Sequence, residues 1–527
     1  MKALLLKILL LFNLFLLLYS CNNKKPDPVV QGNKIPENIK IDTAVINSFH
    51  NQLLTDFYKS CDNNRAWQSA KTRNTFFSCL GKAEEEGLDP EDYNLKKLTA
   101  LEQKFSTLTD KELIDYDLLL TKSFQDYVSH VSNGKLNPRK LYKNWDLKAN
   151  TAPINTILKN SMRTDSMLAY ITQQQQQHIV YKKLKNALKI INTLPDEADF
   201  RKITFKKKIV LNDTSNDLVL IKTRLMYWKD LPYKDSLSNI YDSFTLEGIK
   251  KFQLRHGIVA DGVIGLGTIN ALNVSKEYRK KQIIANLERW RWFPRNMGDD
   301  YLIVNIPDFK LTVIKKQDTI ATYKVIVGSD KRKTPVLTSK LNYAVFNPTW
   351  TVPPTIIKED VIPATARNRG YLTHKNITVY NYKGEVISPE NWNESKAKGY
   401  RYVQSPGSHN SLGSVKIIFR NRFSVYLHDT NHRNYFSRAD RSLSSGCVRV
   451  QNVLKLAEYL INDQKNWSEE KINLLIENLK TTSVKIKKNY YLQQLYWTAW
   501  SEGDQLIFRK DIYSLDNNLY NTLRNQT

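Results

Sequence analysis

The sequence predicts an α+β chain of several domains: a helical scaffold, a small three-helix domain, and a β-rich C-terminal domain with a long insertion. Apolar residues recur at helical spacing from about Thr43 to Ile209, which predicts the scaffold. Short amphipathic segments separated by glycine-containing turns follow between Phe244 and Leu272. Beyond Tyr301 the apolar residues alternate with a period of two, which is typical of strands.

Residues 1–20 have the pattern of a secretory signal peptide. A basic start at Lys2 precedes a run from Ala3 to Leu18 that is almost wholly apolar. A small residue then stands directly before Cys21, which resembles a bacterial lipobox. We therefore predict a lipoprotein signal with lipidation of Cys21, so that the mature chain is anchored to a membrane. An uncleaved N-terminal anchor is the alternative.

Residues 21–42 have the composition of a linker, with Asn, Lys, Pro and Asp, long enough to hold a domain away from a bilayer. A helical scaffold domain is expected over 43–215. Leu54, Phe57 and Tyr58 illustrate its apolar spacing. This part contains no candidate catalytic residues.

The small domain is expected over 216–275. An amphipathic helix ending near Phe252-Gln253 leads into a turn that contains Gly257 and Gly262, and a second short helix follows. Glycine suits such a turn because it adopts positive φ without a steric penalty. The segment is therefore predicted to form a compact three-helix unit without a nucleophile.

The β-rich domain is expected over 276–515, followed by a C-terminal tail over 516–527. Two strands are expected between Leu492 and Tyr513, in addition to those that precede them. The earlier strands are expected at Tyr301–Ile306, Leu311–Ile314, Thr322–Gly328, Tyr343–Phe346, Val415–Phe419 and Phe423–Leu427. Several short strands separated by turns predict a β sandwich.

An insertion over 355–411 interrupts this domain. The stretch between Pro354 and Val415 lacks a strong period but is rich in Tyr and Trp, whereas disordered segments are poor in aromatic residues. Long loops in compact domains are usually functional, so we predict an ordered lid. Trp350 and the pair Pro353-Pro354 would stiffen its hinge.

The chain has 527 residues, 41% of them hydrophobic, and a formal net charge of +27. In a cytosolic protein this charge would suggest a nucleic acid as the partner. The predicted export disfavours nucleic acid and leaves phospholipid head groups and cell-wall carboxylates as anionic neighbours. Because the basic residues are dispersed, much of the charge is expected to be solvated surface.

The chemistry is expected at Cys447, which His428 precedes by 19 residues. A cysteine nucleophile needs a base and backbone N–H groups for the oxyanion. His428 supplies a base, and Gly446 allows a tight turn that aims backbone amides at one point. The helix after Cys447 is expected to begin near Asn452. From these residues alone, a buried cysteine in a turn remains the alternative.

Cys61 and Cys79 lie 18 residues apart in the helical region. They would form a disulfide in an oxidising compartment, or they are two reduced core residues. The sequence leaves both possibilities open. If they pair and Cys21 carries lipid, Cys447 is the remaining free thiol.

The pattern from Tyr426 to Thr430, followed by Ser444-Ser445-Gly446-Cys447-Val448-Arg449, resembles the signature of the L,D-transpeptidases (YkuD-type catalytic domain). Ser445 departs from that signature, because many members carry a second histidine there, and the long multi-domain branch also tolerates a small residue. The helical part resembles the scaffold of that branch. Residues 216–275 resemble a peptidoglycan-binding domain.

The resemblance implies a peptidoglycan L,D-transpeptidase in which Cys447 attacks the donor tetrapeptide stem and forms a thioester. An amine of a neighbouring stem then releases the acyl group, which makes 3-3 cross-links. His428 would be the general base and acid, and Gly446 would supply an oxyanion amide. The substrate contacts would be Arg449, Tyr426, Ser444, Ser445 and Trp350. The expected partners are donor and acceptor stem peptides, and the expected location is the cell envelope, facing the periplasm.

Three other functions fit parts of the sequence. An L,D-carboxypeptidase would use the same site with water as the acceptor. A non-catalytic wall-binding lipoprotein would not need the Cys447/His428 pair. A papain-like protease is disfavoured because its cysteine precedes its histidine. A metal site at His428, His432 and Asp440 lacks a known ligand motif, so neither a metal nor a cofactor is expected.

Overall fold

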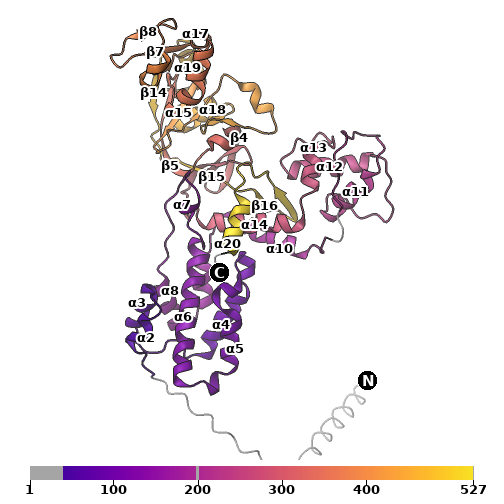
Figure 1. Cartoon of the computed structure of the whole chain (residues 1–527), viewed down its shortest axis with the longest axis vertical. Coiled ribbons are helices and arrows are strands. Elements are labelled where there is room, and N and C mark those ends of the chain that lie inside the picture. The colour runs from indigo at the N-terminus through magenta and orange to yellow at the C-terminus, as the bar shows by residue number, and fades with distance from the viewer. Residues whose placement is uncertain (1–38, 198–200, 526–527) are drawn as a thin grey trace, which may run out of the picture. The chain divides into compact units, whose positions relative to one another are not determined.

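The computed structural model describes residues 39–197 and 201–525. They divide into two compact units, the first comprising the residues up to Ala70 together with Lys96–Thr121, and the second comprising the rest. Figure 1 shows the helices and strands along the chain. Within the described residues no helix is long and apolar enough to cross a membrane. The predicted signal peptide, the lipidation of Cys21 and most of the linker lie outside the described residues.

The helical prediction for the N-terminal region is confirmed. The longest helix is α6, and it is preceded and followed by shorter ones. The helices are α2 (Thr43–Asn47), α3 (Gln52–Lys59), α4 (Ala70–Gly81), α5 (Leu95–Gln103), α6 (Asp110–Asn133), α7 (Pro138–Leu141), α8 (Ile154–Thr164), α9 (Met167–Gln174) and α10 (Ile179–Thr193). Inside the first unit the buried carboxylate of Asp117 accepts hydrogen bonds from Tyr58 Oη at 2.7 Å and from the Trp67 amide at 2.8 Å, so it is satisfied. Cys61 and Cys79 are both free thiols.

The small three-helix unit is also confirmed, with α11 (Asp217–Tyr227), α12 (Ser243–Arg255) and α13 (Leu266–Leu272). Gly262 has a φ of +75°, as the predicted turn requires. The hydrophobic core of this unit also includes Ile203 and Ile209, which lie before the expected boundary at 216. The backbone of Ile209 pairs with that of Ile264, so the segment from Ile203 onwards packs with this unit.

The β-rich domain is built on an 11-stranded sheet among the described residues. The strand order is β1-β5-β10-β11-β13-β4-β3-β2-β15, and β12 and β14 pair with β4 and β5. The strands are β1 (Trp145–Asp146), β2 (Asp300–Asn305), β3 (Lys310–Lys315), β4 (Asp318–Gly328), β5 (Val336–Phe346), β10 (Val415–Phe419), β11 (Leu427–His428), β12 (Ser442–Ser444), β13 (Val448–Val450), β14 (Thr482–Lys485) and β15 (Tyr491–Leu495). One large hydrophobic core joins this sheet to α10 and to α14 (Lys276–Arg291). The helices α18 (Val453–Ile461) and α19 (Glu469–Glu477) complete the domain, and α18 begins where it was expected.

The strand predicted over Phe423–Leu427 is wrong in most of its length. Only Leu427–His428 form β11. The side chain of Asn421 accepts hydrogen bonds from the amides of Phe423 and Val425, and Ser424 has a φ of +55°. This local turn competes with sheet pairing, so the strand starts only where the turn ends.

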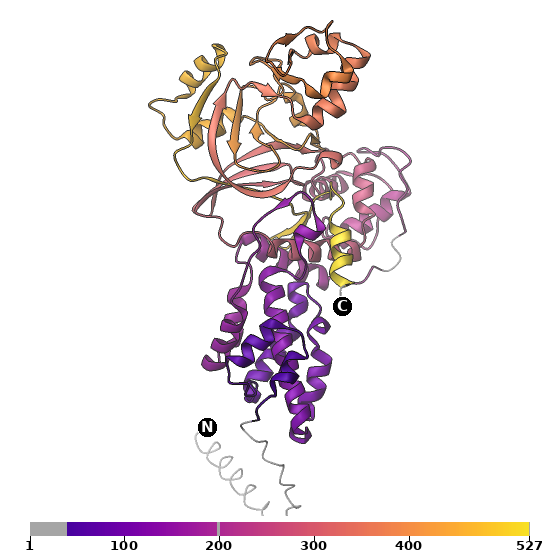
Figure 2. The same cartoon turned by 60° about the vertical axis from the view of Figure 1, so that its left-hand side comes forward.

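The insertion contains strands that the sequence analysis did not predict. Its four-stranded sheet has the order β6-β9-β7-β8, with β6 (Trp350–Thr351), β7 (Ile377–Tyr380), β8 (Val386–Ile387) and β9 (Arg401–Gln404). Short helices α15 (Pro354–Ile356), α16 (Ile362–Arg367) and α17 (Gly370–His374) pack beside it, and the insertion has its own hydrophobic core. Figure 2 shows the folded insertion in orange. The strands are two to four residues long, too short for a clear alternation in the sequence.

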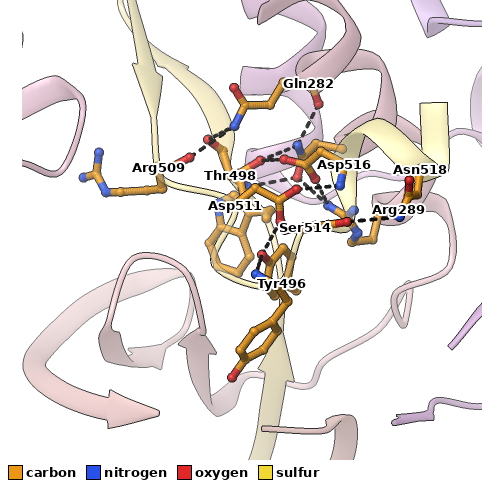
Figure 3. Close-up of polar contacts among 12 residues, drawn as sticks. Gln282, Arg289, Tyr496, Thr498, Arg509, Asp511, Ser514, Asp516 and Asn518 are labelled. Carbon is orange, nitrogen blue, oxygen red and sulfur yellow. Dashed lines mark hydrogen bonds and ion pairs between the residues drawn. The ribbon is translucent and has the colours of Figure 1, made fainter. Parts of the chain in front are cut away.

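The C-terminal region has three strands where two were predicted, and a final helix where a tail was predicted. β16 (Ala499–Glu502) and β17 (Gln505–Phe508) form a hairpin after β15, and α20 spans Asp516–Arg524. Leu519 and Leu523 are buried at helical spacing. Figure 3 shows why the helix is held: the carboxylate of Asp516 accepts hydrogen bonds from Arg289 of α14, at 2.9 Å, and from Thr498. A buried carboxylate requires such partners.

Candidate active site

The register of two short parallel strands sets the geometry of the candidate site. In β11 and β13, Leu427 pairs with Val448 and His428 pairs with Arg449. Paired residues in a sheet share a face, and so do residues two positions apart on one strand. Tyr426, His428, Cys447 and Arg449 therefore belong to one face. Tyr426 and Cys447 directly precede the two strands, so their place on this face extends the alternation by one residue on each strand.

His428 is buried, with 3% of its surface exposed. Burial lowers the pKa of its imidazole to about 3, and the positive charges of Arg449 and Lys416 act in the same direction, whereas Asp429 opposes them. Its Nδ1 is buried and has no hydrogen-bond partner among the described residues. The imidazole is therefore neutral at pH 7, which is the form that accepts a proton.

Cys447 is half-buried, and burial raises the pKa of its thiol to about 11, although the backbone of Tyr426 and the charge of Arg449 lower it in part. The thiol is therefore protonated at pH 7. A protonated thiol and a neutral imidazole fit general-base activation, in which the proton moves as the sulfur attacks. They do not fit a preformed thiolate–imidazolium pair.

The loop before Cys447 is closed by the side chain of Ser444. Ser444 is buried, its Oγ donates to the carbonyl of Cys447 at 2.6 Å, and it accepts from the amide of Gly446 at 3.1 Å. Gly446 has a φ of +108°, a conformation that favours glycine. The predicted oxyanion amide of Gly446 is thus engaged inside the loop, and the amide of Cys447 has no acceptor among the described residues.

A second anchor holds the loop from behind, through residues that the sequence analysis missed. Thr334 Oγ1 donates to the carbonyl of Gly446 at 2.9 Å, and the Thr334 amide donates to Tyr513 Oη at 3.0 Å. Tyr513 Oη in turn donates to the carbonyl of Gly328 at 2.7 Å. Because the carbonyl of Gly446 and the N–H of Cys447 belong to one planar trans peptide, holding the carbonyl also aims the N–H in the opposite direction.

This anchor is continuous with the buried polar network at the C-terminus. The rings of Tyr513 and Tyr496 are stacked at 5.4 Å, and the Tyr513 amide donates to Tyr496 Oη at 3.1 Å. Tyr496 also donates to Asp511, which accepts from the amide of Asp516 at 2.7 Å (Figure 3). No sequence motif marks these residues.

Two basic side chains flank His428. Arg449 is half-buried, with only a long contact of 3.4 Å from its Nη1 to Thr430 Oγ1, and its Nε has no partner among the described residues. Lys416 of β10 pairs with His428 across the sheet, and it was not predicted. The signal was available, since Lys416 is the one charged residue in the otherwise apolar strand Val415–Phe419.

Ser445 is exposed, and its Oγ accepts a hydrogen bond from Arg332 Nη1 at 2.9 Å. The same guanidinium binds Asp360 at 2.6 Å and Glu359 at 2.6 Å. Both carboxylates lie in a π-helical turn of the insertion, Ile357–Val361, so Arg332 connects the insertion to the loop of Cys447. We call this set of contacts the Arg332 latch.

Trp350 is placed differently from the other predicted substrate contacts. It pairs with Gln404 in the sheet of the insertion and packs against the core of the insertion. Cys447 packs against the core of the large sheet. The role of Trp350 as a substrate contact therefore stays a prediction.

The residues considered for a metal site do not form one. Within the described residues, no group of three or more His, Cys, Asp or Glu side chains is arranged to hold a metal ion. His432 is exposed and stacks on Tyr435, whereas Asp440 caps Ser442 and pairs with Lys510 at 3.0 Å.

The raised pKa of the Cys447 thiol predicts how the rate of its alkylation depends on pH. The rate constant for reaction with iodoacetamide should keep rising from pH 7 to pH 10 without a plateau, because only the thiolate reacts and the pKa of the thiol is about 11. The rate is measured by peptide mass spectrometry, with Cys61 of the first unit as the reference in the same digest. A plateau near neutral pH would instead indicate a thiolate–imidazolium pair.

The anchor behind the loop gives a second prediction. Thr334→Val should reduce turnover of a stem-peptide donor by about 10- to 100-fold, because the N–H of Cys447 is then no longer aimed at the oxyanion. Alkylation of Cys447 by iodoacetamide, which needs no oxyanion donor, should change little. Thr322→Val replaces an exposed threonine on β4 and serves as the matched control. Equal losses in turnover and alkylation would contradict this role of Thr334.

Comparison with known proteins identifies the parts of the chain. Residues 299–486 match the model of the "L,D-transpeptidase catalytic domain". Residues 52–188 match that of the "Scaffold domain", and residues 214–272 that of the "Putative peptidoglycan binding domain".

Individual proteins are also similar. A curated protein of Haemophilus influenzae named "Putative L,D-transpeptidase" is 36% identical over 246 residues, which are 46% of this chain and 50% of that protein. The chain thus spans about half the length of this relative. A crystal structure of the L,D-transpeptidase (residues 123-326) from Xylanimonas cellulosilytica DSM 15894 aligns with 55% of this chain and 99% of that chain, at 13% identity and a TM-score of 0.17. That score is too low for the alignment to bear on the fold. The chain thus contains regions similar to an L,D-transpeptidase catalytic domain, a scaffold domain and a peptidoglycan-binding domain.

Proposed function

We propose that the protein is a peptidoglycan L,D-transpeptidase that uses Cys447 as its nucleophile and makes 3-3 cross-links between stem peptides. The observation that supports this proposal best is the register of β11 and β13, in which His428 pairs with Arg449 and Cys447 directly precedes β13. The neutral state of both groups supports general-base activation. The catalytic-domain match and the peptidoglycan-binding match support the wall as the substrate.

In the proposed acylation step, the imidazole of His428 takes the proton of the Cys447 thiol as the sulfur attacks the donor carbonyl. The amide N–H of Cys447 stabilises the oxyanion of the tetrahedral intermediate. The imidazolium then gives its proton to the leaving amine, the C–N bond breaks, and a thioester remains on Cys447. The resting state is restored at His428, since one proton is taken and one is returned.

In the second step an amine of a neighbouring stem attacks the thioester. His428 takes the proton of the attacking amine and returns one to the sulfur of Cys447 as the C–S bond breaks. The product is an amide between two stems, and the free thiol is regenerated. Water as the acceptor would give an L,D-carboxypeptidase, which is the other possible outcome of the same chemistry.

The remaining parts have roles that follow from this proposal. The small unit would hold the wall while the catalytic domain acts, and lipidation of Cys21 would keep the enzyme at a membrane of the cell envelope, facing the periplasm. The peptidoglycan-related domains indicate a cell-envelope location. The insertion would cover the acyl-enzyme as a lid, because the Arg332 latch connects it to the loop of Cys447.

Cys447→Ala should abolish product formation from tetrapeptide-stem muropeptides without a large change in the melting temperature, because the substitution removes only a half-buried sulfur. His428→Gln should reduce turnover by at least about 100-fold, since acylation loses its base. Products are identified by mass: dimers linked between third residues indicate the transpeptidase, and tripeptides alone indicate the carboxypeptidase. Near-normal turnover by Cys447→Ala would refute the nucleophile.

The lid makes a separate prediction. Arg332→Gln removes the charge that holds Glu359, Asp360 and Ser445 together, so the insertion should be less firmly held to the site and water should compete better for the thioester. The ratio of dimers to tripeptides should fall several-fold while the rate of acylation changes less. Arg367→Gln, an exposed arginine of the insertion that bonds to its own helix, is the control. An unchanged product ratio in Arg332→Gln would exclude a lid held by this latch.

A further inference from the structure

Lys416 lies in the candidate site although it is outside the sequence motif. It pairs directly with His428 across β10 and β11, and its Nζ lies 5.5 Å from the centre of the Tyr426 ring. Since paired residues share a face, Lys416 belongs to the same face as His428 and Cys447. Arg449 flanks His428 on the other side, on β13.

In the described part of the chain, neither basic group has a carboxylate partner. Among the described residues, no carboxylate forms an ion pair with Lys416 or with Arg449, although both side chains are half-buried. The nearby carboxylate of Asp429 is already bound by Arg433 at 2.8 Å and by the amide of Ser414 at 3.0 Å. Charges removed from water are stabilised by an opposite charge, so this face suits an anionic group of the substrate.

The proposed reaction indicates which anion fits. His428 gives its proton to the amine of the residue that leaves, and in an amino acid the amine and the carboxylate are attached to the same carbon. A donor that ends at the leaving residue therefore carries its terminal carboxylate within a few bonds of the proton that His428 delivers. The two groups that flank His428 are Lys416 and Arg449, and both are cationic.

We propose that Lys416, acting with Arg449, binds the terminal carboxylate of the donor stem peptide and so selects donors whose scissile bond precedes a free C-terminal residue. This inference rests on the proposed function. It makes Lys416 a specificity-determining residue that touches the substrate, whereas Cys447 and His428 carry out the chemistry. A donor that continues beyond the leaving residue, or that ends in an amide, loses this contact.

The experiment compares two soluble tetrapeptide stems, one with a free C-terminal carboxylate and one with a C-terminal amide, as donors for the full chain. Lys416→Met should lower kcat/KM for the carboxylate donor by roughly 10- to 100-fold, the range of a hydrogen bond to a charged group. The amide donor should lose less than about 3-fold, so the preference for the carboxylate shrinks. Lys416→Arg keeps the charge and should retain most of the preference.

The control is Lys340→Met, which removes an exposed lysine from the neighbouring strand β5 and should leave both donors unaffected. If Lys416→Met does not fold, Lys416→Gln allows the same comparison of donors. Equal losses for the two donors in a folded variant would overturn the role of Lys416 while leaving the transpeptidase proposal intact. A wild-type chain that turns over neither donor would overturn the proposed function, and this inference with it.

Discussion

The candidate site depends on the parallel register between β11 and β13. This pairing involves only two residues on each strand, yet it decides which side chains meet. A slip by one residue would turn every side chain of a strand to the opposite face, and His428 would then enter the core on which Leu427 and Val448 now pack. The apolar residues that alternate with the reactive ones therefore specify the register. Burial of Leu427, Val448 and Val450 is thus a condition for the chemistry on the other face.

The loop before Cys447 adds a second constraint, which comes from a distant part of the chain. Thr334 and Tyr513 hold the carbonyl of Gly446 and the end of β4 at Gly328. A Cβ on Gly328 would lie 2.1 Å from the carbonyl oxygen of Arg332, so no larger residue fits there. Through Tyr496 and Asp511 the same support continues to the buried contacts of Asp516 with α14. Helix α20 thereby contributes to the orientation of a backbone N–H in the site.

Local patterns in the sequence were sufficient to predict part of this structure. The Cys447 motif, the helical region and the strand Val415–Phe419 each depend on neighbours in the chain, and the structure has them where they were expected. Thr334, Tyr513 and Arg332 could not be predicted, because the contacts that tie them to the site join distant segments, such as Thr334 with Gly446 and Arg332 with Ser445. The short strands of the insertion were not predicted, because two to four residues do not establish a period. The turn at Asn421 was not predicted either, because a single side chain is enough to end a strand. Arg449 was predicted from the motif, whereas the place of Lys416 beside His428 follows from the pairing of β10 with β11.

The central claim is that a donor stem becomes attached to Cys447. The most direct test mixes the full chain with a tetrapeptide-stem donor in the absence of an acceptor amine, quenches with acid, and maps the modified peptide by mass spectrometry. The account predicts a hydroxylamine-sensitive acyl group, the donor without its last residue, on the peptide that contains Cys447. The acyl group should be absent from Cys447→Ala and greatly reduced in His428→Gln. Product formation by the wild-type chain with the acyl group on Ser444 or Ser445, or with no covalent intermediate, would contradict it.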